Sequence, residues 1–196
     1  QQRAAQILSF IPLFIMMAAF MGAMQISTDS TAGERERGSL EALLVNPAPR
    51  GALATGKWLA GTTTAMGSVV LSGALLLAIF QSIPLQDLGL RFRLGTPELM
   101  GTLATVLPLC PFIVALQMYL ATFAKSFKEA QSYLSLLMMV QMVPGFVATM
   151  YPVSSKTWMY FLPWVGQQAL LTDVLGGKMP SALFFILAAL LNLLVA

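Results

Sequence analysis

The sequence predicts an all-α membrane protein, a polytopic bundle of transmembrane helices. Of its 196 residues, 57% are hydrophobic and only 10% are charged, whereas a soluble domain carries about 25% charged residues. The mean hydropathy is correspondingly high, at +0.77. The apolar residues form long stretches separated by more polar connections, and no alternating pattern typical of barrel strands occurs. Because lipid cannot satisfy exposed backbone groups, these stretches are expected to cross the membrane as helices.

Crossing the hydrocarbon core requires roughly 20 apolar residues in a helix. Four segments meet this requirement, and a fifth is apolar up to the chain end: 7–26, 58–83, 99–124, 133–151 and 182–196. We therefore treat residues 1–196 as one transmembrane domain. Five spans place the first and third connections on one side of the membrane. Those two connections carry six basic residues against four in the others, which favours them as the cytoplasmic pair.

The polar residues exclude several classes of function. A net charge of +3 is too small and scattered to indicate a nucleic-acid partner. Cys110 is the single cysteine, so it forms no intrachain disulfide. The five spans contain no Asp, Glu, Lys, Arg or His, and they therefore offer neither an acidic cation site nor the ionisable relay of an ion-driven carrier. No energy source of its own is visible in this chain.

The segment 29–50 is a charged interruption between two apolar spans. Thr31 and Glu34 have the spacing of a capping box, which predicts a helix over about 31–46, ended by Pro47 and Pro49. Such a helix would carry an apolar stripe and a charged stripe, with Arg37 and Glu41 close enough to pair. The apolar stripe is Leu40, Leu43 and Leu44, and the charged stripe is Glu34, Arg37 and Glu41.

The charge balance of this helix favours a protein partner. Helices that lie on lipid are usually rich in Lys and Arg, but here three Glu stand against two Arg within residues 34–41. A groove on a soluble protein is therefore the preferred partner, and a helix lying on the lipid surface is the alternative.

Residues 51–57 imitate a phosphate-binding loop, GALATGK. Trp58 stands where Ser or Thr would hold magnesium, and prolines rather than a strand precede the segment. We expect no nucleotide binding and no ATP hydrolysis by this chain.

The segment ERERGSLEALL from Glu34 to Leu44, followed by Asn46-Pro47, Arg50 and Gly56-Lys57, resembles permeases of the type-2 ABC transporter family, especially the sodium-export, NatB-like branch. A later stretch agrees, with Leu162-Pro163, QQALL at 167–171 and DVLGG at 173–177. In that family the charged segment is a cytoplasmic coupling helix that docks on a separate ATPase subunit. The resemblance implies ATPase-coupling roles for Glu34, Arg35, Arg37, Gly38, Leu40, Glu41, Leu43 and Leu44.

The resemblance also implies the assembly. It indicates a permease homodimer with two ATPase subunits in a bacterial or archaeal plasma membrane, with ATP and magnesium held by the partner and no cofactor in this chain. Sodium is the implied cargo, and a lipid, drug or peptide is the alternative. A passive channel or membrane scaffold without an ATPase is the rival from another class. Members of the branch have six spans and a large external domain after the first, so we expect this chain to lack that span and that domain.

The last connection is aromatic and partly amphipathic. Trp158, Tyr160, Phe161 and Trp164 suit a membrane interface, and the following residues place four apolar side chains on one helical face. They are Leu170, Leu171, Val174 and Leu175. We predict short interfacial or re-entrant helices over about 158–175, the alternative being an aromatic belt followed by a loop.

Polar groups within the spans are limited to amides and hydroxyls. Gln117, Gln141, Thr64 and Ser68 are the candidates for a substrate path. For Thr64 and Ser68, close helix packing is the favoured interpretation. Pro108, Pro111 and Pro144 are expected to kink their spans, and thirteen Met suggest an adaptable interior.

Overall fold

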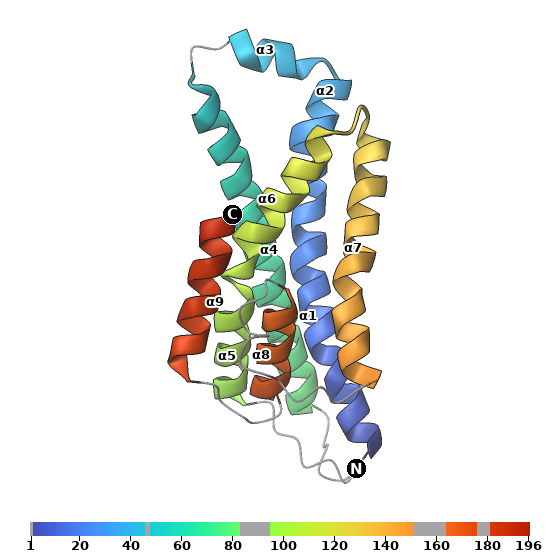
Figure 1. Ribbon diagram of the computed structural model, residues 1–196, viewed down its shortest axis with the longest axis vertical. Helices are drawn as coiled ribbons and strands as arrows, with labels where there is room; N and C mark the ends of the chain where they lie inside the picture. Colours follow the sequence, from blue (N-terminus) through green and yellow to red (C-terminus); the bar gives the residue numbers. More distant parts are fainter. Residues whose placement is uncertain (1, 46–47, 83–94, 151–163, 176–180) are drawn as a thin grey trace.

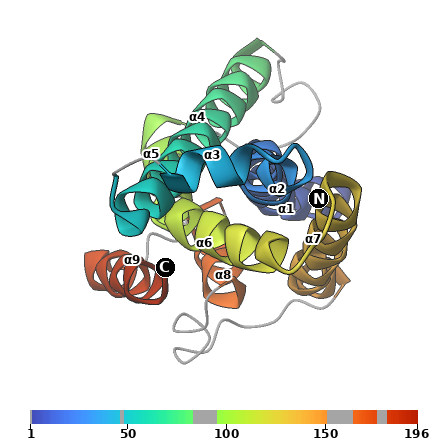
Figure 2. The same cartoon turned by 90° about the horizontal axis from the view of Figure 1, so that it is seen from above.

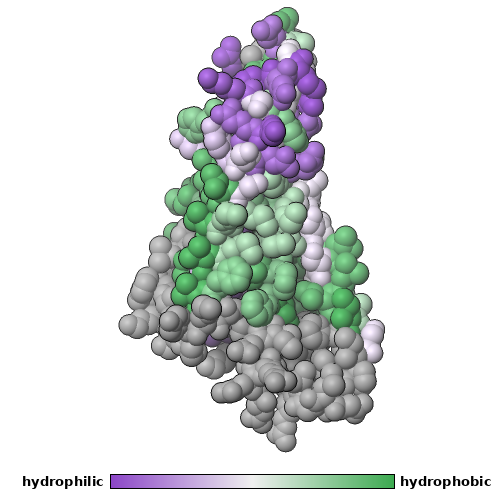
Figure 3. Space-filling view, turned by 90° about the vertical axis from the view of Figure 1, so that its right-hand side faces the viewer, coloured by the Kyte–Doolittle hydropathy of each residue, from purple (hydrophilic) through white to green (hydrophobic). Residues whose placement is uncertain are grey.

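The computed structural model describes residues 2–45, 48–82, 95–150, 164–175 and 181–196, and within them all regular structure is helical. The helices form a bundle along one long axis (Figure 1). The helical segments long and apolar enough to cross a membrane are Phe10–Glu36, Arg50–Ile79, Pro97–Thr122 and Phe127–Val147, with a shorter apolar helix at Leu183–Val195. Polar residues gather at one end of the bundle and apolar residues cover its middle (Figure 3). The all-α membrane fold is confirmed.

Helix α1 (Gln2–Thr28) is the central element of the bundle. It packs against α4 (Arg50–Ser82), α6 (Leu109–Thr122) and α7 (Phe127–Met150). Its buried face contributes Ala19, Phe20 and Ala23 to the largest apolar cluster. Because α1 touches three other spans, a movement of this helix must disturb all of them.

The third predicted span is divided into two helices. α5 (Thr96–Val106) and α6 are separated by a turn at Leu107 and Pro108, where the Cys110 N–H bonds to the Leu107 carbonyl, 3.2 Å away, instead of making an α-helical bond. The missing N–H of Pro108 explains the break. Pro144 has a weaker effect, since α7 continues through it as one helix.

Glycines allow α4 to approach its neighbours closely. A Cβ atom added to Gly22 of α1 would lie 2.3 Å from the Ser68 hydroxyl of α4, and one added to Gly61 of α4 would lie 2.7 Å from Val114 of α6. Gly and Ser at such crossings bring membrane helices together.

Two shorter helices complete the bundle on the side away from the polar end (Figure 1). α8 (Val165–Leu175) packs against α5, α1 and α7 and buries most of its side chains, and α9 (Ala182–Val195) packs against α6 and α5. This burial favours a re-entrant rather than an interfacial position for α8. Residues 158–163 of the predicted helices lie outside the described part of the chain. Before α8, Trp164 has a φ of 75° and meets the Phe112 ring edge-to-face at 6.3 Å.

Candidate functional site

The polar end of the bundle is formed by the continuation of α1 and by the connection between α6 and α7. After α1 the chain passes without a break through one π-helical turn, η1 (Asp29–Gly33), into α2 (Glu34–Glu36). The predicted capping box at Thr31 is therefore wrong. The Thr31 hydroxyl instead donates a 2.6 Å hydrogen bond to the Ser27 carbonyl, one turn earlier. This bond satisfies the side chain without ending the helix.

The predicted single helix over 31–46 is also wrong, because it is interrupted at Gly38. This glycine has a φ of 69°, a left-handed conformation that commonly ends helices. After it, α3 (Ser39–Val45) lies across the end of the bundle, from α2 towards the start of α4 (Figures 1 and 2). The interruption changes the partner of Arg37, which bonds to Asp29 and not, as predicted, to Glu41.

Lys57 of α4 joins that helix to α2 and η1. Its ammonium group forms an ion pair with the Glu34 carboxylate and donates a 2.8 Å hydrogen bond to the Ser30 carbonyl. The two charged side chains are only 20% and 19% exposed, so this pair is less screened by solvent than a surface pair. Residues 51–57, which resemble a phosphate-binding loop in sequence, are part of helix α4. Their Lys57 pairs with Glu34 of the same chain.

Arg37 and Asp29 form a second, more exposed ion pair. The guanidinium lies 2.8 Å from the carboxylate, and both side chains are about half exposed, at 56% and 48%. The hydrogen bond to Asp29 raises the pKa of the Arg37 guanidinium, which therefore keeps its charge. Water screens this pair, so it contributes little to stability.

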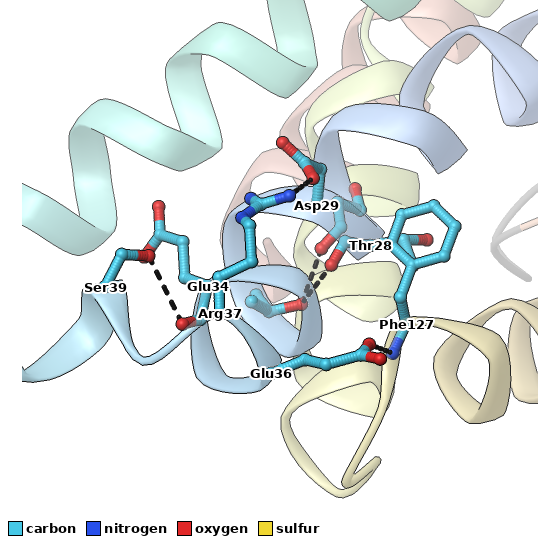
Figure 4. A network of polar contacts seen from close by, with 9 residues as sticks. Thr28, Asp29, Glu34, Glu36, Arg37, Ser39 and Phe127 are labelled. Atoms are coloured by element: carbon cyan, nitrogen blue, oxygen red, sulfur yellow. Dashed lines mark hydrogen bonds and ion pairs between the residues drawn. The ribbon is translucent and has the colours of Figure 1, made fainter.

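Arg35 and Glu36 connect α2 to the turn between α6 and α7. The Arg35 guanidinium donates a 2.9 Å hydrogen bond to the carbonyl of Ala124, in the turn that follows α6. The Glu36 carboxylate accepts a 2.6 Å hydrogen bond from the backbone N–H of Phe127, where α7 begins (Figure 4). Glu36 satisfies a helix N-terminal N–H that has no intrahelical partner, and Arg35 satisfies a carbonyl of the turn. α2 is thus joined to two further spans.

The α6–α7 turn contains a helix cap that sequence reasoning missed, a variant of the capping box in which Glu129 reaches the residue before the cap. Ser126 accepts a hydrogen bond from the Glu129 N–H at 3.2 Å, and Glu129 accepts one from the Lys125 N–H at 2.7 Å. The signal was present as Ser126-Phe-Lys-Glu129 ahead of an apolar run. Four buried alanines let η1, α6 and α7 meet closely beside this turn: Ala32, Ala121, Ala124 and Ala130.

Helix α3 is largely exposed at the polar end. Leu40 and Leu43 are half-buried, Glu41 is exposed, and Val45 is 84% exposed; the Leu44 side chain lies outside the described atoms. Figure 1 shows α3 at the outer end of the bundle, above the other helices. Val45 therefore leaves an apolar side chain open to contact at this polar end.

The amides proposed for a substrate path both bond to α1. Gln117 of α6 donates a 2.9 Å hydrogen bond to the Phe20 carbonyl. Gln141 of α7 donates a 3.1 Å hydrogen bond to the Met16 carbonyl. The hydroxyls do not join them. Thr64 is exposed and bonds within α4, while Ser68 packs against Gly22, as the packing interpretation requires.

Comparison with known proteins identifies the family. The family model described as ABC-2 family transporter protein matches residues 1–195. The chain belongs to this family. It is also 30% identical over 198 residues to the ABC transporter permease protein NatB of Bacillus subtilis (strain 168), an alignment that covers 98% of this chain and 51% of that protein. The chain thus spans about half the length of this relative. No solved structure matches it.

Membership of this family indicates where the ABC-2 permease is located. It is a multi-pass protein of the cell membrane and belongs to a family of transporter proteins.

Proposed function

We propose that this ABC-2 permease is the membrane half of an ATP-driven exporter, and that α3 and the adjoining α2 dock on a cytoplasmic ATPase subunit. The observation that carries the proposal is the exposed α3, held across the polar end by the bend at Gly38. Its exposed Val45 and half-buried Leu40 and Leu43 provide apolar anchors beside the charged Glu41.

The hydrogen bonds beneath α3 suggest how docking moves the spans. Lys57 connects α2 to α4, Arg35 connects it to α6, and Glu36 connects it to α7. Closure of two ATPase subunits on ATP would displace α2, and these bonds would pass the displacement to α4, α6 and α7. ATP and magnesium belong to the partner. A homodimer of the permease, with one ATPase on each copy, gives the two subunits that closure needs.

Not all predicted coupling residues serve the same purpose in this proposal. Glu34 and Arg37 have partners within the chain, in Lys57 and Asp29, so they shape the site. Gly38 sets the direction of α3. The direct contacts with the ATPase then fall to Glu41 and the apolar residues of α3.

The cargo is a separate matter. Resemblance to the sodium-export branch implies sodium, with a lipid, drug or peptide as the alternative. A passive channel or scaffold remains the rival function, and it requires no ATPase contact at α3.

The test is co-purification of the tagged permease with the ATPase encoded beside it, in mild detergent, followed by ATPase assays in proteoliposomes. Val45→Asp and Glu41→Lys should each reduce recovery of the ATPase at least fivefold, because they place charge in the contact or reverse it. Val45→Leu keeps the apolar anchor and should retain the partner. Reversal of Glu34 is less informative, since it also breaks the pair with Lys57. Equal ATPase recovery with Val45→Asp and Val45→Leu would exclude α3 as the docking element.

A further inference from the structure

The helix that runs from α1 into α2 contains one turn of a different kind. In η1 the Glu34 N–H bonds to the Asp29 carbonyl, five residues earlier, whereas an α-helix uses the carbonyl four residues earlier. The turn therefore holds one residue more than an α-helical turn. Single π turns of this kind are rare and occur frequently at functional sites. Their rarity indicates that contacts from outside the helix stabilise this one.

Lys57 of α4 provides such a contact. Its ammonium group donates a 2.8 Å hydrogen bond to the Ser30 carbonyl within η1, and it pairs with Glu34, the residue that closes the turn. Both bonds are partly buried, and hydrogen bonds from a charged donor are among the stronger ones in proteins. The shape of η1 thus depends on where α4 holds its lysine.

The buried side of the turn is made of small residues. Ala32 is buried in the cluster of alanines from α6 and α7, and Gly33 is buried beside it. A Cβ added to Gly33 would lie 2.9 Å from the Asp29 carboxylate and 3.5 Å from the Phe127 ring. The turn therefore packs against the start of α7 without large interlocking side chains that would oppose a rotation.

The extra residue in η1 sets the rotation of α2 about the helix axis. Each residue of an α-helix turns the chain by about 100°, so conversion of η1 to an α-helical turn would rotate α2 by about that angle relative to α1. The guanidinium of Arg35 would then leave the Ala124 carbonyl, and the carboxylate of Glu36 would leave the Phe127 N–H (Figure 4). The π turn and these contacts of α2 therefore belong to one arrangement.

We infer that η1 is a two-state element controlled by Lys57. The turn is π-helical while Lys57 holds the Ser30 carbonyl, and it becomes α-helical when α4 carries the lysine away. That conversion rotates α2 and releases Arg35 and Glu36 from the α6–α7 turn. The inference rests on the proposed function for its driving force, since an ATPase docked on α3 would displace α2 against α4. The element itself belongs to the permease and responds to Lys57 without a partner.

The test uses the purified full-length permease in nanodiscs, with spin labels at Ala42→Cys on α3 and Lys128→Cys on α7, both exposed positions, in a Cys110→Ala background. Electron–electron distance measurements then report the position of α3 relative to α7. Lys57→Met should shift the main distance by at least about 5 Å, because the rotation carries α3 across much of a helix diameter. Lys57→Arg keeps a charged donor and should retain the original distance. Lys125→Met, at an exposed lysine of the α6–α7 turn, is the control and should have no effect.

Deletion of Ser30 tests the extra residue directly. The deletion should make η1 an α-helical turn while α2 keeps its rotation, so the labels should stay at the original distance. Lys57→Met should then no longer shift them. Deletion of Met24, in the regular part of α1, is the matched control. It should displace α3 or lower the unfolding temperature, because it rotates everything that follows.

An unchanged distance in Lys57→Met would overturn the inference. A displacement of α3 by the Ser30 deletion as large as that by the Met24 deletion would overturn it as well. Addition of the ATPase with a non-hydrolysable ATP analogue separates the two proposals. Distances that respond to Lys57→Met but not to the nucleotide-bound ATPase would keep the two-state element and refute the coupling. Distances that respond to neither, while the ATPase docks and hydrolyses ATP, would refute the two-state element alone.

Discussion

Glu34 of α2 and Lys57 of α4 form an ion pair in which each side chain is about one-fifth exposed, at 19% and 20%. The same lysine also donates to the Ser30 carbonyl. The start of the second described span is thus joined to the end of the first at the surface where an ATPase is proposed to dock.

Removal of one partner of this pair should destabilise the permease. Lys57→Met should lower the free energy of unfolding by roughly 1–3 kcal/mol, because Glu34 and the Ser30 carbonyl both lose a charged donor. Arg37→Met, which breaks the exposed pair with Asp29, should cost less than about 1 kcal/mol. Thermal unfolding in detergent measures both. A double-mutant cycle that combines Lys57→Met with Glu34→Gln should show coupling between these two residues. Equal losses of stability in Lys57→Met and Arg37→Met would contradict this account.

Loss of the Glu36 carboxylate should loosen the start of α7. In Glu36→Ala the Phe127 N–H loses its acceptor, so hydrogen exchange over residues 124–130 should quicken several-fold. ATPase stimulation by cargo should fall while basal hydrolysis persists. Glu41→Ala, on α3, should leave exchange in this turn unchanged. Unaltered protection of Phe127 in the Glu36 variant would show that the contact does not hold the turn.

Gly38→Ala should redirect α3 without any steric clash. Nothing lies within 4 Å of a Cβ at this position, but the φ of 69° is unfavourable for alanine, at a cost of about 1 kcal/mol. The expected result is weaker recovery of the ATPase with normal membrane insertion. Gly56→Ala is the control, since it has equal space and lies within α4. Co-purification of both variants to the same extent would show that the bend is dispensable.

Gly22→Ala should separate α1 from α4. The new methyl group would meet the Ser68 hydroxyl at 2.3 Å and its Cβ at 2.6 Å, and overpacking of this kind costs roughly 1–3 kcal/mol. Ser68→Gly in the same chain should restore most of the loss, because it returns the volume. Gly67→Ala, which meets no atom within 4 Å, should be neutral. Failure of Ser68→Gly to rescue stability would show that the Ser68 side chain does not cause the loss.

The long helices were predictable because their apolar length exceeds what a bilayer requires. The charged segment was predictable as a surface element from its composition, but its helices were not. Thr31 has the residue type of a cap, yet its hydroxyl bonds back to Ser27, and such local bonds allow either outcome. The bend at Gly38 then moved Arg37 away from Glu41 towards Asp29.

The contacts of the buried amides could not be predicted from one sequence. Gln117 and Phe20 are 97 residues apart, and Gln141 and Met16 are 125 apart. No local pattern encodes such pairs, because they depend on which helices become neighbours in the bundle. The sequence marked these glutamines as unusual in an apolar span, and the fold supplied their partners.

The unbroken course of α1, η1 and α2 has a mechanical consequence. From Met16 to Glu36 the chain is helical throughout, and at 1.5 Å per residue the distance is about 30 Å. Such a helix behaves as a stiff rod, so torque applied at Glu36 arrives as rotation of the Met16 and Phe20 carbonyls. Those carbonyls hold Gln141 and Gln117. The π-helical turn at η1 would then set how much of any movement imposed by the proposed ATPase partner reaches the interior of the membrane.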